Sequence, residues 1–243
     1  MVRSVRHPAA TIDYPSSDGL PMAESDFQLR PFLYAVETLR TYFQARAEVY
    51  IAGNLFLYYE EGNPQAVVAP DVFVVIGAEK RDRPSYKLWE EPKAPDFVLE
   101  ITSKSTRSED QGAKRGVYAF LGVREYWQYD PTGDYLAPPL QGLRLVGRNY
   151  QPLPATTLLD GTLSLHSAVL GLDMRLEHGT LRFSDPATGQ KLLTHQEAEQ
   201  ARQEAEEHVR REAAMRQAME ARLADLEARL QALQAERSSP SPP

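Results

Sequence analysis

Short apolar runs separated by turn-forming residues fill the first three quarters of the chain and predict an α/β fold. Helical spacing of apolar residues predicts helices over residues 24–45, with the main part beginning at Pro31, and 108–121, with Gly122 as the C-cap. Strands are predicted at the other runs, which cover residues 49–52, 55–59, 72–76, 97–102, 125–129, 143–146, 163–165 and 181–183. Because a strand, a helix and a strand follow one another between residues 97 and 129, part of the sheet should be parallel. We therefore expect an α/β fold with a parallel or mixed sheet.

The composition changes near residue 190, where Ala, Glu, Arg, Gln and Leu begin to dominate. We expect an N-terminal arm over residues 1–20, a folded domain over 21–189, a helical extension over 190–237 and a disordered tail over 238–243. In the extension, five apolar residues step by four, three, four and three positions, as in a coiled-coil seam: Met219, Leu223, Leu226, Leu230 and Leu233. Upstream, Glu212 and Arg216 fall on the same seam, which shortens it to about two heptads. The extension is either a self-association element, most simply of a homodimer, or a solvated helix.

Composition and charge narrow the class of protein. The 243 residues are 42% hydrophobic and include no cysteine, which fits a globular core and excludes a disulfide framework, a thiolate zinc site and a cysteine nucleophile. The longest apolar run is too short to span a bilayer and the N-terminus lacks an apolar signal segment, so we expect a cytoplasmic protein with no membrane partner. The net charge of −7 argues against one large basic surface for nucleic acid, but bound metal ions can supply positive charge to a nuclease.

Two acidic residues lie where packing alone would not place them. In the predicted strand 97–102, alternation puts Glu100 on the face opposite Leu99 and Ile101. A carboxylate in the middle of an apolar strand costs several kcal/mol unless it has a partner. Asp71 opens the apolar run 72–76, and the two carboxylates converge if their strands are neighbours. Such a pair suits Mg²⁺, or Mn²⁺, which prefer oxygen ligands.

A basic residue follows on the next predicted helix. Asp110, Lys114 and Tyr118 recur every four residues, which places them on one helix face. The neighbouring apolar face would dock this helix on the sheet and hold Lys114 within reach of the carboxylates. We expect Lys114 to behave as a surface lysine that contributes no more than about 1 kcal/mol to stability. We expect Tyr118 to be a core residue.

In this order and spacing, the residues resemble the bacterial Uma-two family of endonucleases, which is placed in the PD-(D/E)XK, restriction-endonuclease-like superfamily. The resemblance runs from about Tyr14 to Asp130. It rests on the motifs Pro70-Asp71, Glu100-x-Thr102, the Asp110, Lys114 and Tyr118 spacing, and the sequence GVREYW at residues 122–127. It implies a mixed sheet flanked by helices and divalent-metal-dependent hydrolysis of phosphodiester bonds in DNA.

The resemblance also implies the roles of individual residues. Asp71 and Glu100 match the metal ligands of the motif, whereas the motif lysine should stand at Thr102, which is a departure. Lys114 then supplies the catalytic charge from the helix, with Lys104 as the alternative. Possible accessory residues are Glu24, Lys104, Thr102 and Asp110. The rival interpretation is a non-catalytic member of the fold, a binding or scaffold protein that oligomerises through its C-terminal helix.

Overall fold

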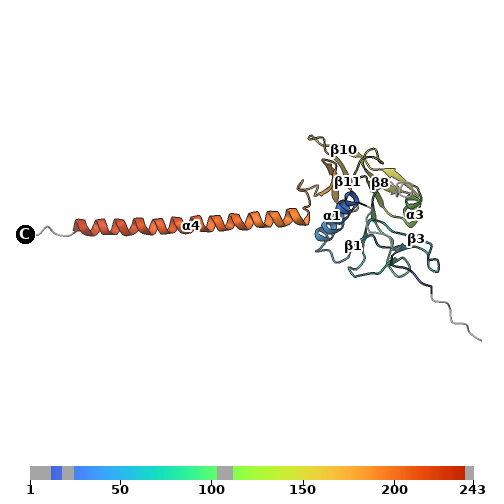
Figure 1. Cartoon of the computed structure of the whole chain (residues 1–243), viewed down its shortest axis with the longest axis horizontal. Helices are drawn as coiled ribbons and strands as arrows, with labels where there is room; N and C mark the ends of the chain where they lie inside the picture. Colours follow the sequence, from blue (N-terminus) through green and yellow to red (C-terminus); the bar gives the residue numbers. More distant parts are fainter. Residues whose placement is uncertain (1–11, 18–24, 103–111, 239–243) are drawn as a thin grey trace, which may run out of the picture. The chain divides into compact units, whose positions relative to one another are not determined.

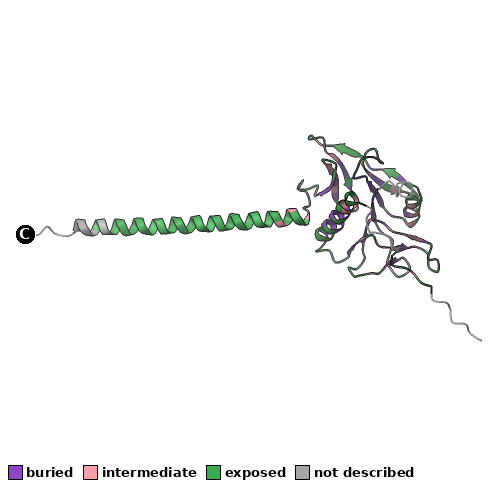
Figure 2. Ribbon diagram, viewed as in Figure 1, coloured by how far each residue is buried: buried purple, intermediate pink, exposed green. Residues whose placement is uncertain are grey.

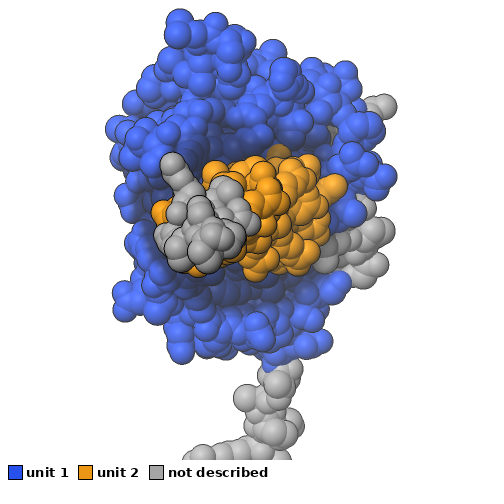
Figure 3. Space-filling view, turned by 90° about the vertical axis from the view of Figure 1, so that its left-hand side faces the viewer, with its two compact units in different colours: residues 1–192 blue, residues 193–243 orange. Residues whose placement is uncertain are grey.

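The computed structural model describes residues 12–17, 25–102 and 112–238, and Figure 1 shows the order of the elements along the chain. The chain divides into two compact units, residues 1–192 and residues 193–243, which Figure 3 draws in blue and orange. The described residues of the first unit form three sheets and two helices, and those of the second consist mainly of one long helix.

A mixed sheet of six strands forms the centre of the first unit. Its strands follow the spatial order β1 (Val49–Gly53), β4 (Val72–Ile76), β6 (Phe97–Ile101), β7 (Glu125–Tyr129), β8 (Leu140–Val146) and β9 (Asn149–Pro152). β6 and β7 are parallel, and the other neighbouring pairs are antiparallel. The helix α3 (Ala113–Leu121) lies in the connection between the two parallel strands. The expected mixed sheet flanked by helices is therefore confirmed.

One face of the central sheet packs against α1 (Asp26–Tyr42) and a second, antiparallel sheet. That sheet has the order β10 (Ala155–Thr157), β11 (Leu163–Ser167), β12 (Leu172–Glu177) and β13 (Thr180–Ser184). Phe97 of β6 shares this core with Leu39 of α1 and Phe183 of β13. The hydroxyl of Tyr34 accepts a hydrogen bond from the N–H of Phe183 and donates one to the carbonyl oxygen of Leu192. The first helix is thereby fastened to the last segment of the unit.

The other face of the central sheet packs against α3 and a small three-stranded sheet. The small sheet has the order β3 (Val67–Val68), β2 (Leu57–Tyr58) and β5 (Tyr86–Lys87). Val98 of β6 and Tyr118 of α3 belong to this second core. Residues 12–17 have no regular secondary structure, yet the ring of Tyr14 lies 5.1 Å from that of Tyr58. Alternate residues of β6 thus enter different cores, as the predicted alternation required.

The two predictions about helix ends have opposite outcomes. α3 ends at Gly122, whose φ of 76° is left-handed, and this confirms the predicted C-cap. α1, however, continues through Pro31 without interruption, so the predicted start of its main part at that proline is wrong. Proline removes a single N–H from the helix, and the burial of Phe32, Val36 and Leu39 against the sheet offsets that loss.

Among the described strands, five had no counterpart in the sequence-based predictions: β3, β5, β9, β10 and β12. β3 and β5 contain two residues each, which is too few to show alternation. β10 is exposed along its whole length and therefore carries no apolar signal. The strand predicted over residues 55–59 is shorter in the structure, where only Leu57 and Tyr58 pair as β2.

The helical extension is confirmed as α4 (His195–Ser238), which begins five residues later than the predicted start at residue 190. Thr194 and Glu197 cap its start reciprocally: each side chain accepts a hydrogen bond from the backbone N–H of the other residue. The described side chains of α4 are almost all exposed, and Figure 2 shows them in green. The described side chains of the seam are exposed by half or more: Met219, Leu223, Leu226 and Leu230. None of the described helices has the length and apolar character that a membrane span requires.

Candidate active site

Glu100 lies at a central position of the main sheet. Its strand, β6, is hydrogen-bonded on both sides, antiparallel to β4 and parallel to β7. The side chain projects from the face that packs against α3, while Leu99 and Ile101 enter the opposite core. Glu100 is fully buried. A carboxylate this deep requires compensation, because removing its charge from water costs several kcal/mol.

Asp71 immediately precedes β4, the antiparallel neighbour of β6, and the structure brings it to Glu100. The Oδ2 atom of Asp71 accepts a hydrogen bond from the N–H of Ile101 over 2.6 Å. The N–H of Asp71 lies 3.4 Å from Oε2 of Glu100. The two acidic residues, 29 positions apart in sequence, are therefore direct neighbours across the strand pair.

α3 supplies the cation and a second donor. Lys114 Nζ lies 3.1 Å from Oε2 of Glu100, and the lysine side chain is only 16% exposed. One turn later, the hydroxyl of Tyr118 donates to Oε1 of Glu100 over 2.6 Å. Burial, with the nearby charge of Glu100, raises the pKa of Tyr118 well above its usual value, so the hydroxyl keeps its proton. Each carboxylate oxygen of Glu100 thus has a partner on α3.

Lys114 and Tyr118 differ from the sequence-based expectations. Lys114 is largely buried beside a buried carboxylate rather than on a solvated surface. Tyr118 is in the core as expected, but it also bonds a candidate site residue. The spacing of four residues between Lys114 and Tyr118 was the available signal for this second role.

Three other carboxylates are buried among the described residues: Asp96, Glu125 and Asp130. Asp130 accepts hydrogen bonds from the backbone of the turn that follows it, including the N–H groups of Tyr135 and Leu136. Glu125, on the opposite face of β7, accepts from the backbone N–H of Ala168 and holds the second sheet. Asp96 also pairs with a lysine, Lys93, but that side chain is 43% exposed. Glu100 differs because it combines a largely buried ammonium group and a phenol with the backbone N–H of another acidic residue.

Two buried polar atoms lie on the Glu100 side of the sheet without a hydrogen-bond partner among the described residues. One is Oγ1 of Thr102, two positions after Glu100, where the motif lysine was expected. The other is Nε2 of Gln128, which pairs directly with Glu100 in the parallel register of β6 and β7. Sequence reasoning missed Gln128 because nothing local encodes that register. It also missed Gln28, whose Nε2 lies 3.5 Å from the carbonyl oxygen of Ile101.

Three predicted accessory residues, Glu24, Lys104 and Asp110, lie outside the described residues. The structure therefore joins Asp71, Glu100 and Lys114 and places Thr102 on the same side of β6.

The donor set is tested here against a divalent cation. Within the described ranges, no group of three or more histidine or acidic side chains could hold a metal ion. Mg²⁺ needs less than that, since it is usually held by one or two carboxylates and keeps several of its waters. Asp71 and Glu100 supply such a pair, and the unpaired atoms of Thr102 and Gln128 are suited to bind ordered water. The residues fit a hard divalent ion.

Comparison with known proteins gives one family. The family model Uma2, described as "Putative restriction endonuclease", matches residues 22–177. Among solved structures, four chains match, and one is a "putative nuclease belonging to DUF820" from Anabaena variabilis. That chain is 12% identical, with a TM-score of 0.43, and the similarity covers 60% of this chain and 74% of that one. No curated protein matches this chain.

Proposed function

Because the chain belongs to the Uma2 family of restriction-endonuclease-like proteins, we propose that it is a divalent-metal-dependent endonuclease that hydrolyses phosphodiester bonds in DNA. The observation that supports this activity is the joining of Asp71, Glu100 and Lys114 at the end of two central strands. Packing does not require this arrangement, because an apolar residue at position 100 would avoid the cost of a buried charge. A site for metal and phosphate accounts for all three residues.

Each side chain has a definite task in this proposal. Asp71 and Glu100 would hold Mg²⁺ or Mn²⁺, which when bound supplies positive charge at the scissile phosphate and eases loss of a proton from the attacking water. Lys114 points its ammonium group at the same place and stabilises negative charge that develops on the phosphate. Tyr118 fixes the orientation of Glu100, and the N–H of Ile101 fixes that of Asp71.

We also propose that α4 joins two copies of the chain. Four described seam residues are exposed to solvent, and a parallel or antiparallel partner helix would bury them. The rival function, a binding or scaffold protein without catalysis, uses the same helix but needs no metal at Glu100.

Calorimetry and a nicking assay test the proposed activity. The full chain should bind Mn²⁺, and Glu100→Gln and Asp71→Asn should each remove the binding signal. Glu37→Gln, which changes an exposed carboxylate on α1, is the matched control and should bind as the unaltered chain does. Supercoiled DNA should be nicked in Mg²⁺ and spared in EDTA. If the chain binds metal but does not nick DNA, the result favours the rival function of a binding or scaffold protein without catalysis. Unchanged Mn²⁺ affinity in Glu100→Gln would contradict a metal site at Glu100.

A further inference from the structure

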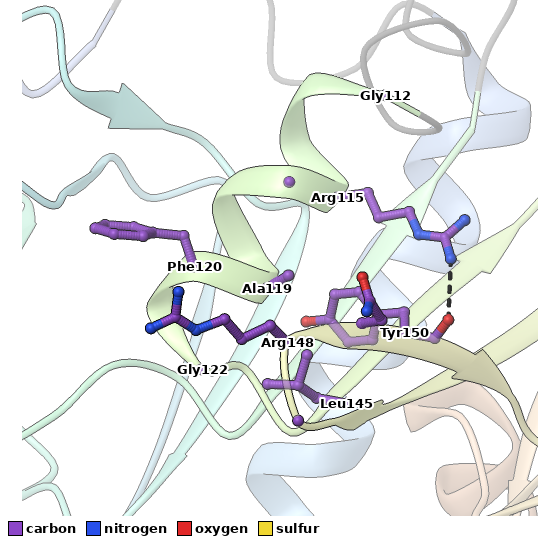
Figure 4. A pocket seen from close by; sticks show the side chains of 11 residues that line it. Gly112, Arg115, Ala119, Phe120, Gly122, Leu145, Arg148 and Tyr150 are labelled. Carbon is purple, nitrogen blue, oxygen red and sulfur yellow. Dashed lines mark hydrogen bonds between the residues drawn. The ribbon is translucent and has the colours of Figure 1, made fainter.

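A groove of about 800 Å³ lies beside α3, between that helix and the hairpin of β8 and β9 (Figure 4). Lys114 and Tyr118 use one side of α3 to contact Glu100, whereas Arg115 and Ala119, one position further on, line the groove. The same helix therefore forms a wall of the groove and supplies two groups to the candidate active site. A helix with its side chains is about 10 Å across, so the groove and the site are close neighbours.

The groove is basic in a protein that is acidic as a whole. Arg115 and Arg148 line it and are both exposed, and none of its eleven lining residues is acidic. Arg115 donates a hydrogen bond over 3.1 Å to the carbonyl oxygen of Tyr150, drawn as a dashed line in Figure 4. This bond holds the guanidinium in place, and the residue remains exposed. A planar guanidinium fixed in this way is well suited to phosphate oxygens.

An aromatic side chain, Phe120, also lines the groove. Phe120 is 81% exposed, and Figure 4 shows its ring standing clear of α3. A single exposed apolar residue needs no explanation, but Phe120 lines the same groove as Arg115 and Arg148. An exposed ring next to phosphate-binding charges is the arrangement on which unpaired bases stack.

Gly116 provides an independent observation. It lies inside α3, where glycine destabilises a helix relative to alanine. A Cβ atom at this position would meet nothing within 4 Å, so packing within the described residues does not require glycine. Its effect is to leave the helix backbone open at the wall of the groove, where a ligand can approach closely.

We propose that the groove binds a single-stranded segment of nucleic acid, with a base stacked on Phe120 and phosphates paired with Arg115 and Arg148. The inference rests on the proposed nuclease function and narrows its substrate to DNA that carries unpaired nucleotides. A duplex would need a broad basic surface, which the net charge of −7 opposes, and its bases could not reach the ring.

Fluorescence anisotropy of the full chain in EDTA tests binding without cleavage. The probes are a labelled 15-nucleotide single strand of mixed sequence and the matching duplex. Phe120→Ala should weaken single-strand binding about 5- to 150-fold and leave duplex binding nearly unchanged. Arg148→Gln should weaken single-strand binding and reduce the slope of log affinity against log salt by about 0.7.

Matched controls come from exposed residues elsewhere in the chain. Leu159→Ala removes a fully exposed apolar side chain, and Arg210→Gln removes an exposed arginine of α4; neither should alter binding. Glu100→Gln should bind the single strand as the unaltered chain does, because Glu100 does not line the groove. If the unaltered chain binds the single strand but does not nick DNA in Mg²⁺, the proposed function is defeated and the groove stands.

Three results would overturn the inference about the groove. The first is unchanged single-strand affinity in Phe120→Ala and Arg148→Gln, including the case in which the chain binds no single strand at all. The second is an equal loss for single strand and duplex, which would reduce the groove to a non-specific charged patch. The third is that Phe120→Ala has a lower mass than the unaltered chain in light scattering while its DNA binding is unchanged. That result would mean that the Phe120 ring makes a contact between two copies of the chain.

Discussion

The hydroxyl of Tyr118 donates a 2.6 Å hydrogen bond to Oε1 of Glu100, and both side chains are fully buried. Because burial raises the pKa of Tyr118 well above its usual value, the donor keeps its proton and the carboxylate stays oriented. Glu100 therefore depends on α3 for its position as well as for its counter-charge. Mutation of an outer group that orients a metal ligand typically lowers metal affinity or activity by about 10- to 100-fold.

Tyr118→Phe is expected to weaken Mn²⁺ binding about 10- to 100-fold, because Glu100 loses the group that orients it. The same change should lower the free energy of unfolding by about 1 to 3 kcal/mol, because a buried carboxylate oxygen loses its donor. Calorimetry and urea titration measure the two effects. Tyr129→Phe, which removes a buried hydroxyl bonded to Gly179 on the other face of the sheet, should leave the metal affinity unchanged. Equal affinity in both variants would make Tyr118 a structural residue only.

Lys114→Met should reduce nicking by about 100-fold or more, since a charge aimed at the phosphate is lost. It should also lower the free energy of unfolding in EDTA by about 1 to 3 kcal/mol, because Glu100 keeps a buried charge without its cation. Saturating Mn²⁺ should recover much of this deficit by binding the folded form. Lys104→Met is the comparison: if it abolishes nicking while Lys114→Met does not, the lysine has been misassigned.

Leu223→Glu combined with Leu230→Glu is expected to convert a dimer into a monomer, because charges would enter the seam of α4. Both side chains are more than half exposed, so the change removes no packing within the chain. Light scattering on the full-length chain gives the mass. The control is Leu159→Glu, which places the same charge on an exposed loop residue. A dimer that survives the double change would assign self-association to residues 1–192.

Asp130→Asn should destabilise the fold near neutral pH by about 2 to 3 kcal/mol, because an amide nitrogen would face backbone donors. Burial alone would raise the pKa of Asp130, but hydrogen bonds from Tyr135, Leu136 and Thr132 outweigh it and lower the pKa. The stabilisation is therefore complete above the unfolded pKa of about 3.9 and is lost as the pH falls through the lower folded value. Urea titrations from pH 7 to pH 3 should show the two proteins converging, and a constant difference would contradict this.

Substitution of two glycines by alanine should change the free energy of unfolding in opposite directions. Gly116→Ala is expected to raise the free energy of unfolding by about 1 kcal/mol, since the helix gains propensity and the Cβ meets open space. Gly142→Ala should lower it by about 1 to 3 kcal/mol, because its Cβ would lie 2.8 Å from the ring of Trp127. Thermal unfolding of the two variants measures both signs. A stability loss in Gly116→Ala would show that packing, and not the groove, requires the glycine.

The central strands were predictable because their apolar runs are dense. Residues 72–76 and 125–129 were predicted with the bounds that β4 and β7 have in the structure. β7 is buried along its whole length, and β4 is buried in all but its last residue, Ile76, so their bounds follow closely from the runs of buried side chains. Pro31 misled the prediction of α1 because the local cost of proline was weighed without the burial of the residues that follow it.

Some residues of the candidate site could likewise be predicted from the sequence, and others could not. Glu100 stands out in sequence because it interrupts an apolar strand, and Asp71 because it opens one. Lys114 follows from its helical spacing. Gln128 could not be found, since its place beside Glu100 depends on the register between two strands separated by a helix. Thr102 was predicted as a departure from the motif and a possible accessory residue, and the structure has a buried hydroxyl there without a hydrogen-bond partner among the described residues.

The hydrogen bonds of the Tyr34 hydroxyl can form only late in the synthesis of the chain. Its partners, Phe183 and Leu192, lie 149 and 158 positions further along the chain. α1 emerges early from the ribosome, but the hydrogen bonds of Tyr34 to Phe183 and Leu192 cannot form until the end of the first unit has been made. At about 5 to 20 residues per second, the interval is roughly 8 to 30 s. Throughout that time the apolar face of α1 lacks its final cover, so the nascent chain depends on slow, long-range closure and is open to chaperone binding.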